Sequence, residues 1–205
     1  MQFGAKPPIG IAYDTSFGDS PDDVPALQLL YSLAAKNECR VIALSISKPN
    51  LKAAIAADIV ARDAGAPLRR GLPIGLATTG PGGEDTPILE SILSGKAESS
   101  IQSINDTAEP HALIRNALTA QHDKNAVIVC CGRTNNLDLT LSLPGAREII
   151  EQKTLRLVLA AAEPANPADA DALRRVLASW PVEIVTIGPD VASRYQAAIR
   201  AALKR

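Results

Sequence analysis

Short apolar segments of strand length alternate with longer segments of helical periodicity along the whole chain. The short segments are almost continuously apolar, as in residues 126–131 (AVIVCC) and 40–47 (RVIALSIS). Strands of this kind belong to parallel sheets that are covered by helices on both faces. The pattern therefore predicts an α/β fold, a three-layer α/β/α domain with a mainly parallel sheet. The predicted strands are residues 8–13, 40–47, 73–76, 126–131, 155–160 and 182–187, and the predicted helices are 24–35, 51–64, 88–93, 110–122, 168–179 and 192–203.

The length of 205 residues suits a single domain over residues 1–205, and no low-complexity linker divides the chain. Lys+Arg 21 against Asp+Glu 22 gives a net charge of −1, which argues against a nucleic-acid or anionic-membrane partner. No apolar run approaches the ~20 residues of a membrane helix. Two of the three cysteines are adjacent, Cys130 and Cys131, so we expect buried core residues rather than a disulfide framework. These features predict a cytoplasmic protein in a reducing compartment.

The first predicted strand runs into a turn that holds four carboxylates: Asp14, Asp19, Asp22 and Asp23. In parallel α/β sheets, ligands bind where the loops leave the carboxyl ends of the strands. Carboxylates packed this densely repel one another unless they are exposed, protonated or bridged by a hard cation such as Ca²⁺. The same segment also suits a helix start, with Ser20 as N-cap and Pro21 in the first turn. Spacing alone favours the well-capped helix over the metal site.

The motif Asp14-Thr15-x-x-Gly18-x-x-x-Asp22-Asp23-x-x-Ala26-Leu27 resembles the signature of the nucleoside hydrolase superfamily, whose members include inosine/uridine-preferring enzymes. Residues 41–50 (VIALSISKPN), 127–137 (VIVCCGRTNNL), 163–166 and 188–191 are similar, in the same order, to later motifs of that family. The resemblance implies the nucleoside-hydrolase fold and hydrolysis of the N-glycosidic bond of a nucleoside or related riboside, with a bound Ca²⁺ that helps to generate the nucleophile.

Carried over position by position, the resemblance assigns two groups of site residues. The implied metal ligands are Asp22, Asp23 and the backbone carbonyl of Asn135, and the implied sugar contacts are Asn50, Glu163 and Asn166.

The chain departs from the family pattern at the residue that should act as general base. Ser16 stands where the family has an Asp, and a serine hydroxyl is a poor base near neutral pH, so Asp14 or Asp19 would have to replace it. The chain also ends before the family's last metal-binding Asp and its His; His111 and His122 fall on a predicted helix and are expected at the surface. Two hypotheses follow: an N-ribosyl hydrolase, or a catalytically degraded relative that binds a small ligand or serves as a structural subunit. The shortened chain also predicts a homo-oligomer.

Two cations occupy predicted strand ends where the family is neutral. Lys48 precedes Asn50, and Arg133 replaces a proline. We interpret them as charge-compensating residues that neutralise Asp14, Asp22 and Asp23 and take over part of the role of the metal; the alternative is that both point into water. The turn-rich residues 77–87 are expected to form a mobile loop, with a lid over the strand ends as the alternative.

Overall fold

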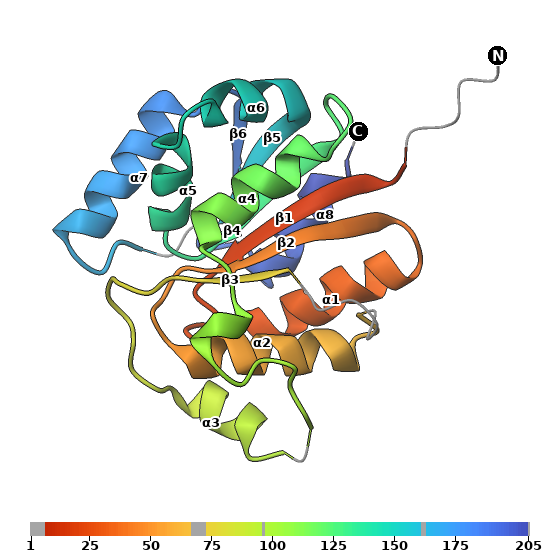
Figure 1. The fold of residues 1–205 in the computed structure, drawn as a ribbon, viewed down its shortest axis with the longest axis vertical. Coiled ribbons are helices and arrows are strands. Elements are labelled where there is room, and N and C mark those ends of the chain that lie inside the picture. The colour runs from red at the N-terminus through yellow and green to blue at the C-terminus, as the bar shows by residue number, and fades with distance from the viewer. Residues whose placement is uncertain (1–6, 67–72, 96, 161–162, 205) are drawn as a thin grey trace.

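The computed structural model describes residues 7–66, 73–95, 97–160 and 163–204. Six parallel strands form one sheet in the order β3-β2-β1-β4-β5-β6 (Figure 1). The mainly parallel sheet expected from the apolar runs is confirmed. The strands are β1 (Ile9–Thr15), β2 (Cys39–Ile46), β3 (Ile74–Leu76), β4 (Ala126–Cys131), β5 (Thr154–Leu159) and β6 (Glu183–Thr186).

Helices cover both faces of the sheet and complete the three layers (Figure 1). One face packs against α1 (Asp23–Ala35), α2 (Leu51–Asp63) and α8 (Arg194–Leu203). The other packs against α4 (Pro110–Thr119), α5 (Asn135–Leu141), α6 (Ala146–Lys153) and α7 (Pro167–Ser179). Two shorter elements, α3 (Pro87–Leu93) and the 3₁₀ turn η1 (Ile104–Asp106), lie between β3 and α4 along the chain.

Side chains that alternate along the buried strands feed two separate cores. In β1, Ile11 and Tyr13 enter the core beneath α1 and α8, whereas Ala12 enters the core beneath α4. Cys131 and Cys130 divide in the same way, and both thiols are free and buried, as expected. The central strands β1 and β4 are buried on both faces, and this requires a nearly continuous apolar sequence.

Two helices and one strand end differ from the sequence-based expectations. Helices α5 and α6 were not predicted, because they are short and their apolar periods are interrupted by polar residues. Strand β1 continues to Thr15, so Asp14 belongs to the buried strand and not to the turn after it. The remaining predicted elements are present with shifts of a few residues at their ends.

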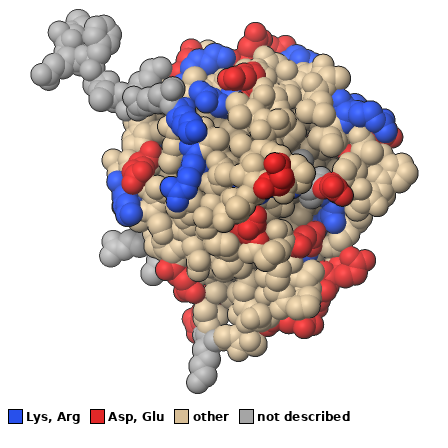
Figure 2. Space-filling view, turned by 180° about the vertical axis from the view of Figure 1, so that it is seen from behind, with Lys and Arg blue, Asp and Glu red and all other residues tan. Residues whose placement is uncertain are grey.

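The surface charge agrees with the balanced composition. Figure 2 shows Lys and Arg side chains interspersed with Asp and Glu on the face drawn there, separated by uncharged surface. None of the described helices is both long and apolar enough to cross a membrane.

Candidate functional site

The site lies where the adjacent strands β1 and β4 end. From β1 the chain proceeds to β2 and β3 on one side, whereas from β4 it proceeds to β5 and β6 on the other, so the two carboxyl ends form a topological switch point. The backbones of the two strand ends lie so close together that no side chain fits between them at Gly132. A Cβ on Gly132 would lie 2.6 Å from the carbonyl carbon of Thr15 and closer still to Ser16 N. Arg133 N donates to Ser16 Oγ at 3.1 Å, and Ser16 Oγ lies 2.9 Å from Ser47 Oγ. Ser16 therefore links the ends of β4, β1 and β2.

Asp14 is a fully buried carboxyl at the centre of these strand ends. Its Oδ1 accepts hydrogen bonds from Ser45 Oγ at 2.5 Å and from Asn136 Nδ2 at 2.7 Å, and the Cys130 thiol lies 3.7 Å from Oδ2. Burial raises the pKa of Asp14 from 3.8 to about 7, and the three donors oppose that rise only in part. Asp14 thus holds Ser45 of β2 and Asn136 of α5 against the end of β1.

Asp23 organises the acidic turn from its buried centre. Its Oδ1 accepts from Thr15 Oγ1 at 2.8 Å, and its Oδ2 accepts from the backbone N–H groups of Gly18 at 2.9 Å and Ser20 at 3.0 Å. Burial raises the pKa of Asp23 to about 7 despite these donors. The neighbouring Asp22 is half-buried at the N-cap position of α1, where its own backbone N–H donates to Ser20 Oγ at 3.2 Å. The predicted cap is wrong in position: α1 begins at Asp23, Asp22 is its N-cap residue without a side-chain cap hydrogen bond, and Ser20 and Pro21 belong to the turn before the helix.

A chain of ion pairs crosses the strand ends beside these carboxyls. Lys48, whose side chain is 0% exposed, donates from Nζ to Asp19 Oδ1 at 2.6 Å. Asp19 Oδ2 accepts from Arg133 at 3.3 Å, and Arg133 Nε lies 3.6 Å from Asp169 Oδ2. The side chains of Arg133 and Asp169 are 12% and 3% exposed. The order Lys48–Asp19–Arg133–Asp169 alternates in sign, so each buried cation has a carboxylate next to it.

The contacts of Lys48 and Arg133 match neither of the two interpretations drawn from the sequence. Neither points into water, and their described ion pairs are with Asp19 and Asp169, not with Asp14, Asp22 or Asp23. The expected partners are wrong because Asp14 and Asp23 are already satisfied by neutral donors. Charge compensation itself is present, at a different carboxylate.

Asp169 is a site residue that sequence reasoning missed. Its Oδ1 accepts from Asn135 Nδ2 at 3.1 Å, and its Oδ2 accepts from Asn166 Nδ2 at 3.2 Å. Asn166 Oδ1 in turn accepts from Asp169 N at 3.0 Å and caps α7. The spacing of Asn166 and Asp169, an N-cap residue followed by an acid three positions on, was the available signal. Two of the predicted residues, Asn135 and Asn166, therefore meet at this carboxylate.

Asn50 lies on the other side of the site and secures a loop. Its Oδ1 caps α2, while its Nδ2 lies 3.0 Å from Gly83 O and 3.1 Å from both Glu84 O and Asp85 Oδ1. Arg133 Nη1 donates to Pro81 O at 3.0 Å, and Thr86 Oγ1 donates to Gly18 O at 2.7 Å. The segment 77–87, expected to form a mobile loop, is thus held by hydrogen bonds to residues that follow β1, β2 and β4.

Glu163 does not join the other predicted residues. It is exposed and lines a separate, mainly apolar cavity of about 320 Å³ at the ends of β5 and β6. Asn50, Glu163 and Asn166 therefore contact three different parts of the molecule.

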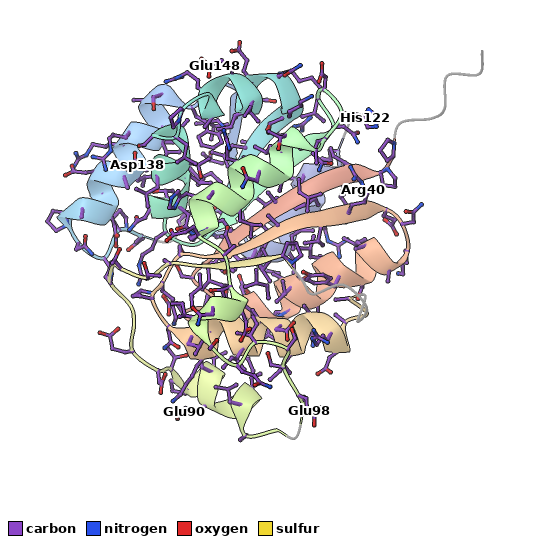
Figure 3. The ribbon with its side chains drawn as sticks, in the orientation of Figure 1. Arg40, Glu90, Glu98, His122, Asp138 and Glu148 are labelled. Atoms are coloured by element: carbon purple, nitrogen blue, oxygen red, sulfur yellow. The ribbon has the colours of Figure 1, made fainter. Side chains whose placement is uncertain are left out.

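A second cavity, of about 200 Å³ and lined by both polar and apolar residues, opens beside the switch point, and one of the two histidines lines it. His111 lies in the first turn of α4, and this turn packs directly on β3. The contact is so close that a Cβ at Gly75 would lie only 2.6 Å from Pro110 Cα. Leu76 N and Ala108 N form hydrogen bonds with the Ala108 and Ile74 carbonyls that fix this approach. The expectation that His111 is a solvated surface residue is met only in part, since its side chain is 23% exposed. His122 lies at the opposite end of the sheet, near the amino ends of the strands, as does Arg40 (Figure 3).

Whether the acidic turn fits a calcium ion depends on the number and kind of oxygen ligands that it offers. Ca²⁺ takes six to eight oxygen ligands and several carboxylates in tight sites. In the part of the chain that the structure describes, no three His, Cys, Asp or Glu side chains are grouped so as to hold a metal ion. Both oxygens of Asp23 accept hydrogen bonds, and two buried cations occupy the neighbouring strand ends. This arrangement does not fit an all-oxygen calcium cage.

The raised pKa values make stability depend on pH. A carboxyl with a pKa of about 7 in the folded chain and ~3.9 in the unfolded chain favours folding most below about pH 4. Its contribution falls as the pH rises from about 4 to about 7 and is constant above that. We expect the free energy of unfolding of the wild type, relative to Asp14→Asn, to fall across this window when measured by urea denaturation. Parallel pH profiles for the two proteins would contradict a buried, protonated Asp14.

No protein-family model matches the chain, and no curated protein matches its sequence. Among solved structures, a plant nucleoside hydrolase is similar with a TM-score of 0.61 and 18% identity, over 90% of this chain and 61% of that chain. The effector protein XOO4466 and the type III effector protein XopQ, solved in complex with adenosine diphosphate ribose, are both similar with a TM-score of 0.59 and 12% identity. Both similarities extend over 97% of this chain, and over 65% and 66% of those chains. The chain therefore has a nucleoside-hydrolase-like α/β fold and spans 61% to 66% of the length of these proteins.

Proposed function

We propose that this protein binds a riboside at the carboxyl ends of β1, β2 and β4, without a metal ion, and leaves the N-glycosidic bond intact. The observation that carries the proposal is the Lys48–Asp19–Arg133 chain of ion pairs, in which the Lys48 side chain is fully buried. It supplies fixed positive charge beside the acidic turn, in the region where the family resemblance implies Ca²⁺. The fold supports a ribose-bearing ligand, because the solved relatives are a nucleoside hydrolase and an effector in complex with adenosine diphosphate ribose.

The proposal excludes hydrolysis because the candidate bases are engaged. Asp14 has no exposed surface and accepts hydrogen bonds from Ser45 and Asn136. Asp19 is partly exposed, but Lys48 and Arg133 each hold one of its oxygens. Ser16 is bonded to Ser47 and to the backbone of Arg133. None of these groups is arranged to take a proton from an attacking water.

The alternative is the calcium-dependent N-ribosyl hydrolase that the family resemblance implies. Asp22, Asp23 and the Asn135 carbonyl would then have to bind the ion, which requires Asp23 to exchange its present hydrogen bonds for metal contacts. This alternative and the proposal make opposite predictions about EDTA.

We expect ribose or adenosine to raise the melting temperature in the presence of EDTA. At a ligand concentration near ten times the Kd, the stabilisation is about 1.4 kcal/mol, or roughly 3–6 °C for a chain of this size. Differential scanning calorimetry with and without added Ca²⁺ measures the shift. In parallel, chromatography of inosine and uridine incubated with the protein should show no released base. Ca²⁺-dependent release that Asp23→Asn abolishes would contradict the proposal and establish the hydrolase.

A further inference from the structure

The two edges of the sheet differ in how they end. At the β3 edge, Leu76 N donates to Ala108 O and Ala108 N donates to Ile74 O, so the segment before α4 closes that side. At the other edge lies β6, and among the described residues no segment pairs with its outer side (Figure 1). An open edge exposes backbone N–H and C=O groups that can pair with another chain. The sheet is therefore closed at β3 and open at β6.

The direction of the β6 backbone identifies the groups that face outward. Ile187 N donates to Leu159 O of β5 at 2.9 Å. Because backbone groups alternate in direction along a strand, Val185 also faces β5, whereas the N–H and C=O groups of Ile184 and Thr186 point away from it. Thr186 is exposed and Ile184 is half-buried. These two residues thus offer four backbone groups to a further strand.

The β6 side chains have the pattern of a strand inside a sheet rather than that of a protected edge. Ile184 packs on the core beneath α4, whereas Val185 and Ile187 pack on the core beneath α1 and α8, and all three remain half-buried. Helix α8 packs mainly on β4 and β5. Protected edges carry charges, prolines or bulges, but the single charge in β6 is Glu183 at its first position, and β6 pairs with β5 without a bulge. A neighbouring strand would bury the apolar side chains further.

The mainly apolar cavity of about 320 Å³ adjoins the open edge. Its lining includes Thr186 and Ile187, where β6 ends, and Leu177 of α7. Leu177 is 48% exposed, and Val191, in the loop that follows β6, is 40% exposed. Apolar surface concentrated beside an unpaired strand is typical of a surface that binds another protein chain.

We propose that β6 is a dimerisation edge, on which β6 of a second copy of this chain pairs in the antiparallel direction across a twofold axis. A second copy is the occupant that this edge favours, because a twofold axis presents the same surface from both sides and makes every contact twice. The net charge of −1 on each chain leaves little repulsion between the copies. This dimer goes beyond the proposed function and does not depend on it.

The outward groups of β6 fix the register of the pair. In an antiparallel ladder, residues that face the neighbouring strand lie opposite each other and exchange two hydrogen bonds. Pairing Ile184 with Thr186 of the second copy uses all four outward groups of each strand and places Val185 on the axis. Glu183 then lies opposite Ile187 of the second copy, so no like charges are opposed. The same register brings Ile184 of the second copy beside Thr186, which lines the apolar cavity.

The oligomeric state tests the dimer directly. We expect light scattering after size-exclusion chromatography to give twice the mass of one chain at roughly 100 μM, where a dimer with a Kd of about 1 μM is almost wholly associated. Thr186→Pro removes an outward N–H and no bond to β5, so it should halve the measured mass while the far-UV circular dichroism stays unchanged. Thr186→Val keeps that N–H and should remain dimeric.

Cysteine cross-linking tests the register. Val185 would lie opposite its own counterpart in a non-hydrogen-bonded pair, with Cα atoms about 4.5 Å apart, which suits a disulfide. The three native cysteines are buried, so Val185→Cys should form a covalent dimer on mild oxidation. Glu183→Cys is the matched control: two residues from the axis, its Cα would lie at least roughly 13 Å from its counterpart, and no covalent dimer should form.

Three results would contradict these expectations. A wild type that is monomeric at roughly 100 μM, well above a micromolar Kd, overturns the dimer. A dimer whose mass Thr186→Pro leaves unchanged overturns the assignment to β6, because the second copy then binds elsewhere. If Thr186→Pro halves the mass but Glu183→Cys cross-links and Val185→Cys does not, the register is wrong.

Discussion

Replacement of Asp19 by Asn is expected to lower the free energy of unfolding by about 3 kcal/mol, because it leaves the Lys48 ammonium buried beside a neutral amide. Breaking a buried ion pair typically costs 3–5 kcal/mol, and the partial exposure of Asp19, 31%, favours the lower end of that range. For a chain of 205 residues this loss corresponds to a fall in melting temperature of roughly 6–12 °C.

The chain contains a matched control for this variant. Lys52 and Asp85 form an ion pair whose side chains are 54% and 37% exposed, so Asp85→Asn should change the melting temperature much less. The double variant Asp19→Asn with Lys48→Met should recover part of the loss, because it removes the buried charge as well as its partner. Equal effects of Asp19→Asn and Asp85→Asn would show that the Lys48 pair is not desolvated.

Replacement of Gly132 by Ala is expected to be more damaging, with a loss of more than about 4 kcal/mol or no folded protein at all. The added Cβ would lie 2.6 Å from the carbonyl carbon of Thr15, and this contact is with backbone that cannot move aside without separating β1 from β4. Separation of the two strands would also break the hydrogen bond from Arg133 N to Ser16 Oγ. Far-UV circular dichroism and urea denaturation measure the outcome.

Gly83→Ala serves as the comparison for Gly132→Ala. A Cβ at Gly83 would meet only Pro49, at 3.3 Å from its carbonyl oxygen, so a small local adjustment suffices. A stable, wild-type-like Gly132→Ala protein would mean that the ends of β1 and β4 are not held as closely as described.

The fold was largely predictable from the sequence because each buried strand is apolar on both faces. The run 126–131 is β4 without change, and the helical periods of residues 24–35 and 51–64 correspond to α1 and α2. Helices α5 and α6 were not predicted, since both are short and polar residues interrupt their apolar periods. The position of Asp14 inside β1 was also missed, because a carboxylate is an unusual residue in a buried strand.

The site was predictable only in part. The acidic turn, Lys48 and Arg133 were identified from their places at predicted strand ends, and Asn135 and Asn166 from the family resemblance, but the partners of these residues were not predicted. A fully buried lysine is rare, and long cationic side chains usually extend to water, so no local pattern indicates that Lys48 pairs with Asp19. His111 reaches its cavity through the contact between Pro110 and Gly75, which are 35 positions apart in sequence. Contacts of that range are set by tertiary packing.

The most direct test of metal-independent recognition is isothermal titration calorimetry of Ca²⁺ into the metal-free wild type, with and without saturating ribose. Metal-independent recognition predicts no heat of Ca²⁺ binding in either condition and an unchanged ribose affinity when Ca²⁺ is added. Micromolar Ca²⁺ binding that Asp23→Asn abolishes would contradict it, and would mean that the acidic turn is a metal site despite the buried cations beside it.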